Sequence, residues 1–351
     1  MKNKSDPTYI IGEIGQNHNG SIDLAKTLIE SVARSVVDKF NGKELSGMDA
    51  VKFTKRDLKQ ELSNSQMTKV YDSKHSFGRT YGEHRKFLEL SNDQHFELFK
   101  YAKSFGLDFV ETLCATGTLT LLKLFTPDKL KVASRDINNL PLLEALAETK
   151  LPIILSLGMA GNKELDAALN IITKYHSNIS ILHCVSEYPT QYKNVNLKSL
   201  NYLQKYYHQF SIGYSDHTIG IATPVAAVAM GAKIIEKHIT LDRKMKGTDQ
   251  AGSLAIDGID RMVRDIRNLE LSMGEEELFI CDDVSRVKEK LERSIASIQP
   301  LIPGQVLTIN DIHLLSPGNG YKWTDRGLII GKKIRVDLPA NEIIYPEHLI
   351  Q

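Results

Sequence analysis

Eight short apolar runs, separated by stretches with helical periodicity, constrain the fold of this chain more than any other feature. Near-continuous apolar runs are typical of strands that are buried on both faces of a parallel sheet. Eight such strand–helix units over about 270 residues have the size of a (β/α)8 barrel, so we predict an α/β chain with a TIM barrel. An open doubly wound sheet is disfavoured because no Gly-x-Gly-x-x-Gly follows the first run. The runs are YIIGEIG (9–15), DAVKFTK (49–55), LDFVETLC (107–114), KLKVAS (129–134), LPIILSLG (151–158), ISILHCV (179–185), FSIGYSDH (210–217) and AKIIEKHI (232–239).

The pattern changes after the last helix expected for the barrel, at 257–274. A charged stretch, EEELFICDDVSRVKEKLE (275–292), is typical of a linker helix. The remaining segment has short β-like runs broken by Pro-Gly and Pro-Gly-Asn-Gly, which indicates a small, turn-rich domain. We therefore predict a barrel over 1–280, a linker over 281–291 and a small β-rich domain over 292–351. So small a domain has a marginal core, which favours packing against the barrel or another subunit.

Charge and cysteine content exclude several classes of protein. The formal net charge is +1 with 25% charged residues, which argues against a nucleic-acid scaffold. Three cysteines without metal-ligand or redox spacing fit a reducing compartment. No apolar run approaches about 18 residues, and the apolar run near the N-terminus is too short for a signal peptide. The expectation is a cytoplasmic protein with neither nucleic acid nor membrane as a partner.

Polar residues gather where the predicted strands end, which is the face that carries the active site in barrels of this kind. Lysines and hydroxyls that converge there suit a ligand with a phosphate and a carboxylate. Two imidazoles on neighbouring strands suit one divalent cation with open positions. A single strand-end histidine is more often structural, and a strand-end serine often caps the next helix. From the residues alone, the prediction is a phosphate-binding barrel enzyme. The strand-end residues are Glu13, Asn17, His18, Lys52, Glu111, Thr112, Lys131, Ser134, Asp136, Ser156, His183, Ser186, Tyr188, Ser215, Asp216, His217, Glu236 and His238.

At these positions the sequence resembles the sialic acid (nonulosonate) synthase family. The resemblance covers nearly the whole chain and keeps the order of the family's motifs. The C-terminal segment resembles the family's SAF, or antifreeze-like, domain. The matching motifs are IGEIGQNHNGS, VKF, KVASRDINNLPLLE, PIILSLGM, LHCVSEYPT, GYSDHTIGIA, GAKIIEKHITLD and GTDQAGSL.

The resemblance implies a transferase that condenses phosphoenolpyruvate with a mannosamine-type sugar to a nine-carbon 2-keto acid, releasing phosphate. It implies that His217 and His238 hold Mn2+ or Mg2+, that Glu13 and Asp136 lie near the reacting atoms, and that Asp249 lies near the sugar. It also implies a homodimer in which the small domain of one subunit covers the barrel of its partner. The residues implied to surround phosphoenolpyruvate are Lys52, Thr112, Lys131, Ser134, Ser156, Ser186, Tyr188 and Ser215.

Several positions depart from the pattern of the bacterial N-acetylneuraminate synthases, mostly on the side of the sugar. Thr54 stands where a glutamine is usual, and Arg135 replaces a small residue. An insert at 71–91 resembles the animal-type synthases, which use a sugar 6-phosphate. Its basic residues Lys74, His75 and Arg79 are candidates for binding that phosphate, although a solvated loop explains them equally well. The other departures are Leu157, Gln250 and Ser316.

The acceptor sugar therefore stays open. N-acetylmannosamine, free or as its 6-phosphate, is the leading expectation. A related synthase could use another aldose, such as mannose 6-phosphate or a diacetamido-hexose. A non-catalytic sugar-binding barrel is disfavoured because buried lysines and histidines without a ligand would be costly.

Overall fold

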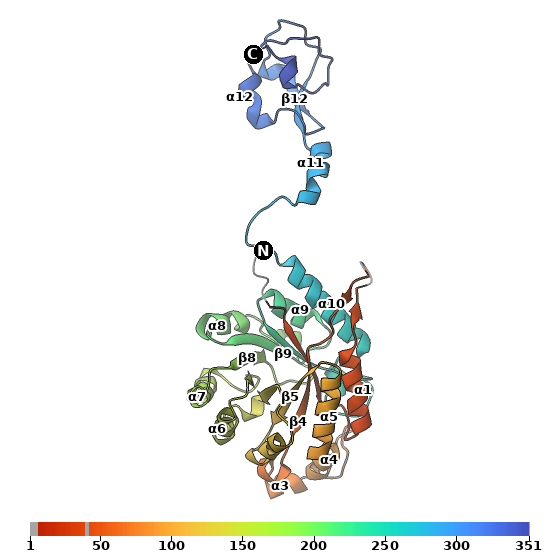
Figure 1. The fold of residues 1–351 in the computed structure, drawn as a ribbon, viewed down its shortest axis with the longest axis vertical. Coiled ribbons are helices and arrows are strands. Elements are labelled where there is room, and N and C mark those ends of the chain that lie inside the picture. Colours follow the sequence, from red (N-terminus) through yellow and green to blue (C-terminus); the bar gives the residue numbers. More distant parts are fainter. Residues whose placement is uncertain (1–5, 39–41, 351) are drawn as a thin grey trace. The chain divides into compact units, whose positions relative to one another are not determined.

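A closed barrel of eight parallel strands forms the first part of the chain, and the predicted TIM barrel is thereby confirmed (Figure 1). The computed structural model describes residues 6–38 and 42–350, and the chain divides into two compact units after Gly274. The first strand closes the barrel by pairing with both the second and the last. The barrel strands are β1 (Tyr9–Gly15), β4 (Ala50–Lys55), β5 (Asp108–Leu113), β6 (Lys129–Val132), β7 (Ile153–Ser156), β8 (Ile179–Cys184), β9 (Ser211–Asp216) and β10 (Ile234–His238).

Helices surround the barrel and bury their apolar faces against it (Figure 1). The third strand is the exception, since a 3-10 segment, Thr116–Lys123, follows it in place of an α-helix. Side-chain caps begin several helices; Ser91 and Gln94 form a capping box at the start of α5, which satisfies backbone N–H groups without partners. The helices of this unit are α1 (Ile22–Ala33), α2 (Leu58–Glu61), α3 (Asn64–Thr68), α4 (Tyr81–Leu88), α5 (Asn92–Ser104), α6 (Leu140–Glu148), α7 (Asn162–Ile172), α8 (Ser199–Tyr206), α9 (Ala222–Ala229) and α10 (Ile256–Ser272). A two-stranded sheet, β2 (Val36–Val37) with β3 (Glu44–Leu45), lies between α1 and β4 in the sequence.

The inward side chains form layers, because successive residues of a strand point to opposite faces. A cluster that includes Ile11, Val110, Ile154 and Leu182 fills the barrel near the start of the strands. Two residues further along the same strands come Glu13, Thr112, Ser156 and Cys184. The apolar layer thus supports a polar layer directly above it, toward the carboxyl ends of the strands.

Outside the barrel, a buried ion pair joins the last two strands. Lys237 and Asp216 are neighbours in the register and are both fully buried, with their charged groups 2.5 Å apart. Asp216 also accepts hydrogen bonds from Tyr214 Oη, the Thr218 backbone N–H and Thr223 Oγ1. Lys237 donates to the carbonyl of Thr218 as well. The network therefore holds the turn after β9, which carries His217.

The second unit, Glu275–Gln351, has a core of its own and is the expected small β-rich domain. Strands β11 (Ser294–Ser297) and β12 (Ile312–Leu315) pair antiparallel, and short turns and the single-turn helix α12 (Arg326–Ile329) complete the unit. Its core consists of nine buried apolar side chains: Ile295, Leu301, Leu307, Ile312, Ile329, Ile334, Leu338, Ile344 and Leu349.

The linker helix predicted over 275–292 was wrong in extent, because the described structure is helical only at α11 (Ser285–Leu291) and in a 3-10 turn before it. Three consecutive glutamates begin the segment, and Leu278, Phe279 and Ile280 are exposed. Like charges at the start of the segment disfavour a helix there, and a short helix is marginal in water without tertiary packing. In the part of the chain that the structure describes, no helix is long and apolar enough to cross a membrane.

The buried pair leads to a prediction about stability. We expect Lys237→Met to lower the free energy of unfolding of the first unit by roughly 3–5 kcal/mol, because it leaves the Asp216 carboxylate buried without a counter-charge. Arg261→Met, which breaks the exposed pair with Asp257, is the control and should cost less than about 1 kcal/mol.

Urea unfolding followed by circular dichroism at 222 nm measures the helices, which belong mostly to the first unit. The only tryptophan, Trp323, lies in the second unit, so its fluorescence should show an unchanged transition in both variants. Equal losses of stability in the two variants would contradict a special contribution of the buried pair.

Candidate active site

Eight side chains, one from each strand, form a polar ring at the carboxyl ends of the barrel. All eight line one cavity of about 340 Å3. They share the inward face because each stands an even number of residues from the inward positions below it. The ring consists of Glu13, Lys52, Thr112, Lys131, Ser156, Cys184, Ser215 and Glu236.

Lys52 lies between two carboxylates of the ring. Its Nζ atom is 3.0 Å from Glu13 Oε2 and 3.6 Å from Glu236 Oε2, and all three side chains are buried. Ser215 Oγ donates to Glu236 Oε1 at 2.9 Å. The hydroxyl of Thr112 lies 3.4 Å from Lys52 Nζ. The two carboxylates therefore share one lysine but differ in their further partners.

This difference separates the pKa values of the two carboxylates. Burial raises the pKa of Glu13 to about 7, although the charge of Lys52 opposes the rise. Burial also acts on Glu236, but Lys131, Lys52 and the hydrogen bond from Ser215 outweigh it and hold its pKa well below the usual range. Near neutral pH Glu236 is thus ionised, while Glu13 is able to take up or release a proton.

Two members of the ring, Lys131 and Ser156, form a small polar cradle together with Ser134 and Gly158 from the segments after their strands. Lys131 Nζ donates to Ser156 Oγ at 2.6 Å, and the Gly158 N–H donates to Ser134 Oγ at 2.9 Å. A Cβ atom at Gly158 would come within 2.3 Å of Ser186 Oγ, so only glycine leaves this space open. A buried lysine with hydroxyl and backbone donors is suited to an anion such as a phosphate or carboxylate.

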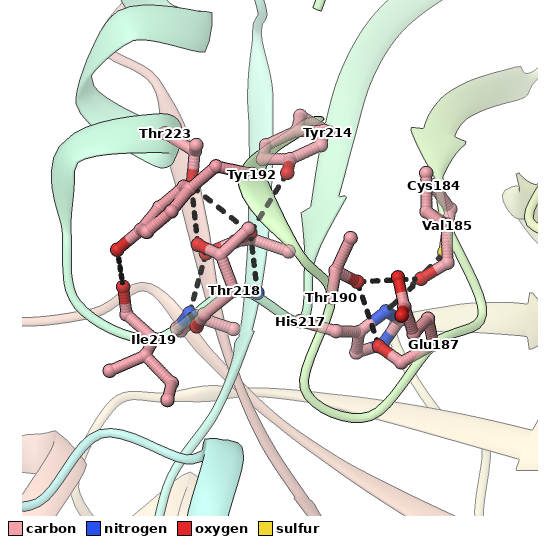
Figure 2. Close-up of polar contacts among 12 residues, drawn as sticks. Cys184, Val185, Glu187, Thr190, Tyr192, Tyr214, His217, Thr218, Ile219 and Thr223 are labelled. Carbon is pink, nitrogen blue, oxygen red and sulfur yellow. Dashed lines mark hydrogen bonds and ion pairs between the residues drawn. The ribbon is translucent and has the colours of Figure 1, made fainter. Parts of the chain in front are cut away.

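The two strand-end histidines lie together in the same cavity. The ring centroids of His217 and His238 are 5.2 Å apart, and Tyr188 packs against both imidazoles. His217 Nδ1 lies 2.8 Å from the Val185 carbonyl and donates to it, so the neutral ring keeps its lone pair on Nε2 (Figure 2). Thr190 Oγ1 donates to the Val185 carbonyl too, which fixes the loop that orients His217.

These residues fit a divalent cation in one respect that the geometry itself shows. His238 Nδ1 is buried and lacks a hydrogen-bond partner, and the Asp249 carboxylate is 3.9 Å away. Burial lowers the pKa of His238, which favours the neutral ring that ligates metals. Among the described residues, no group of three or more His, Cys, Asp or Glu side chains forms a complete cation site. Two imidazoles would leave the remaining positions to water and substrate.

The main cavity brings together all but one of the site residues that the family resemblance implies. Asp136 is the exception: it is the last residue of the 3-10 turn Ser134–Asp136 and lines an adjoining side cavity of about 230 Å3, whereas Ser134 and Arg135 of the same turn line the main one. Of the other strand-end residues, five line neither cavity: Asn17, His18, Glu111, His183 and Asp216. The residues that line the main cavity are Glu13, Lys52, Thr112, Lys131, Ser134, Ser156, Ser186, Tyr188, Ser215, His217, His238 and Asp249.

Sequence reasoning missed two arginines that line both cavities, Arg56 and Arg85. Arg56 follows β4 directly, which is the available signal, since residues after a barrel strand face the site. Arg85 gave no signal, because it lies on α4 within the insert. The basic residues that had been expected to act from this insert, Lys74, His75 and Arg79, line neither cavity.

Gln250, one of the departures on the sugar side, holds a loop in place and does not line the main cavity. It is fully buried, forms a hydrogen bond with Thr240 Oγ1, and donates to the Asn17 carbonyl at 3.2 Å. It therefore fixes the loop that carries Asp249 against β1 and β10.

Comparison with known proteins agrees with this geometry. The NeuB family model matches residues 41–278, and the SAF domain model matches residues 292–350. The chain is 36% identical over 344 residues to the N-acetylneuraminate-9-phosphate synthase of Homo sapiens, covering 97% of this chain and 92% of that protein. It is 35% identical over 350 residues to the N,N'-diacetyllegionaminic acid synthase of Legionella pneumophila, covering 97% and 94%.

A solved structure is similar as well. The N-acetylneuraminic acid (sialic acid) synthetase of Leptospira borgpetersenii, crystallised with citrate, superimposes with a TM-score of 0.65 at 32% identity and covers 80% of this chain and 90% of that one. The expected family, and with it an enzyme of the synthase type, is confirmed. The matched models, the two relatives and the shared fold together show that the chain belongs to the NeuB family of sialic acid synthases and carries a SAF domain.

Proposed function

We propose that the protein condenses phosphoenolpyruvate with an N-acetylmannosamine-type sugar, forming a nine-carbon 2-keto acid and inorganic phosphate. The observation that carries the proposal is the single cavity in which an anion cradle, a carboxylate of raised pKa and a pair of imidazoles meet. Each part suits one component of the reaction: the phosphate and carboxylate of phosphoenolpyruvate, a proton to be moved, and an aldehyde to be polarised.

In this proposal Lys131, Ser134 and Ser156 bind phosphoenolpyruvate, and the backbone N–H of Gly158 fixes the Ser134 hydroxyl. His217 and His238 would hold Mn2+ or Mg2+. When bound, such a cation supplies Lewis acidity toward the aldehyde oxygen of the sugar. The nucleophilic carbon of phosphoenolpyruvate forms a C–C bond to the aldehyde carbon, and cationic character develops at C2 of phosphoenolpyruvate.

Glu13 is then the group that takes a proton from the water adding at C2, which balances the proton that the former aldehyde oxygen takes up to become a hydroxyl. Phosphate leaves by cleavage of its C–O bond to C2 as the C2 carbonyl forms. The nearby Lys52 orients the Glu13 carboxylate, and ionised Glu236 stabilises the positive charge that develops. Asp249, beside His238, would bind a hydroxyl of the sugar. We assign Asp136, two residues after Ser134, a place in the side cavity.

The proposed reaction is compatible with more than one acceptor sugar. Relatives whose names give different products are almost equally similar, at 36% and 35% identity, so similarity does not select among acceptors. Mannose 6-phosphate or a diacetamido-hexose would use the same anion cradle and imidazoles.

For the whole protein we propose a barrel over 1–280, a linker over 281–291 and a SAF domain over 292–351. We also propose a cytoplasmic homodimer, because small domains of this kind expose apolar side chains; Ile302 and Leu328 are more than half exposed here. Light scattering on a size-exclusion column should give the mass of two chains, and a monomer at micromolar concentration would contradict the dimer.

Release of phosphate tests the proposed reaction. Incubation with phosphoenolpyruvate, Mn2+ and each of N-acetylmannosamine, its 6-phosphate, mannose 6-phosphate and a diacetamido-hexose should release phosphate with at least one sugar. EDTA should abolish the release, and His217→Ala should lower it by at least about 100-fold, because the imidazole is expected to hold the cation. His208→Ala, a change on the loop before β9 and outside the cavity, is the matched control. No release with any sugar, despite binding of phosphoenolpyruvate, would contradict the proposed reaction.

The raised pKa of Glu13 predicts a specific dependence on pH. As a base Glu13 must be ionised, so kcat/KM for phosphoenolpyruvate should fall as the pH drops through about 7, rather than near the usual value of 4.5. Glu13→Gln should lower the rate by about 100- to 10,000-fold, and its residual activity should lack this acidic limb. The measurement is a pH–rate profile at saturating Mn2+; an acidic limb that persists unchanged in Glu13→Gln would assign the titration to another group.

A further inference from the structure

The side cavity that adjoins the main one is lined by three arginines from three separate elements. Arg56 follows β4, Arg85 lies on α4 and Arg135 lies in the 3-10 turn after β6. All three also line the main cavity, so the two spaces adjoin at these residues. Because the three arginines come from distant parts of the sequence and line one cavity, they indicate a binding site rather than a basic stretch of surface.

The arginines are only partly neutralised by the protein. Arg56 lies 3.2 Å from Glu61 and 3.6 Å from Glu89, and Arg135 lies 3.4 Å from Asp136. The side chain of Arg56 is 10% exposed, and its Nε atom lacks a hydrogen-bond partner. A buried donor without a partner is costly unless a ligand satisfies it.

Arg85 is the least compensated of the three. Its Nε and Nη2 atoms donate to Tyr81 Oη at 2.9 and 2.6 Å. Within the described ranges, no carboxylate forms an ion pair with it. Glu61, Glu89 and Asp136 pair with Arg56 and Arg135, and Glu89 also lies 3.9 Å from Lys55. Arg85 is therefore the guanidinium group of the three whose positive charge remains for an anionic ligand.

Arg135 and Thr54 both line the main cavity, so a cation and a short hydroxyl side chain face the bound substrates there. Lys74 and Arg79 of the insert are exposed and line neither cavity, so they do not provide this charge.

We propose that the acceptor sugar carries an anionic group, a phosphate or a carboxylate, and that Arg56, Arg85 and Arg135 bind this group in the side cavity while the aldehyde faces the imidazoles. The inference rests on the proposed function, since it specifies the class of sugar used by the same site. Guanidinium groups recognise both anions through paired N–H donors, and the two are told apart by experiment.

The test compares three acceptors that differ at the sixth carbon: N-acetylmannosamine, its 6-phosphate and N-acetylmannosaminuronic acid. With saturating phosphoenolpyruvate and Mn2+, kcat/KM from phosphate release should be at least about 10-fold higher for one of the anionic sugars than for the neutral one. The preferred anionic sugar identifies phosphate or carboxylate as the ligand. Equal kcat/KM for all three sugars, or a preference for the neutral sugar, would overturn the inference.

Substitutions of the arginines test whether these residues bind the anionic group of the sugar. Arg135→Gln and Arg85→Gln should each reduce the ratio of anionic to neutral kcat/KM by about 10- to 100-fold, mostly through KM of the sugar. Arg85→Lys should restore part of the ratio because it keeps the charge. Lys74→Gln, which removes an exposed cation of the same insert, is the matched control and should leave the ratio unchanged. KM for phosphoenolpyruvate reports whether the variants keep an intact barrel. A ratio unchanged in both arginine variants would overturn the inference.

A second measurement separates the failure of this inference from that of the proposed function. If no sugar supports phosphate release, the proposed reaction fails, and titration calorimetry with N-acetylmannosamine 6-phosphate and with the uronic acid decides the inference alone. Binding of either sugar that Arg135→Gln weakens about 10-fold or more, and that Lys74→Gln leaves unchanged, would support the anion site. Absence of binding, or equal binding by both variants, would overturn it.

Discussion

Closure of eight parallel strands is the constraint on which the rest of this structure depends. Once the strands close, every second residue points into a space shared with seven other strands. Residues as distant in sequence as Glu13 and Glu236 thereby come to flank the same lysine, Lys52. The apolar layer beneath, with Ile11 and Leu182 among its members, keeps this polar ring at the carboxyl ends of the strands.

Buried charge is arranged differently on the two faces of the barrel. Outside, Lys237 and Asp216 satisfy each other, with hydroxyl and backbone groups completing the network. Inside, Lys52 is shared between Glu13 and Glu236, and the cradle around Lys131 is open to the cavity. A closed network stabilises the fold, whereas an incompletely compensated one is suited to bind a charged substrate.

The site divides into a part built on strands and a part built on loops. Strands carry Lys131 and Ser156, which are proposed to bind phosphoenolpyruvate, the substrate common to all the acceptors considered, and Ser134 lies just beyond β6. Arg56, Arg85 and Arg135 come from the segments beyond the strands, and these determine the shape and charge of the side cavity. Because loops tolerate substitution without loss of the barrel, a change of acceptor requires no change in the strand-borne groups.

The sequence by itself determined the barrel and the order of its strands, because period-two alternation and strand ends are local signals. Its resemblance to the family supplied most of the polar residues that line the main cavity. It also showed Arg135 as a departure. It could not show that Asp136 leaves the main cavity, that Gln250 is buried under Thr240, or that the linker is helical only from Ser285. Those outcomes depend on contacts between segments far apart in the chain, and so does the fact that Arg85 and Arg56 line the same cavity. Such contacts exist only once the tertiary structure has formed.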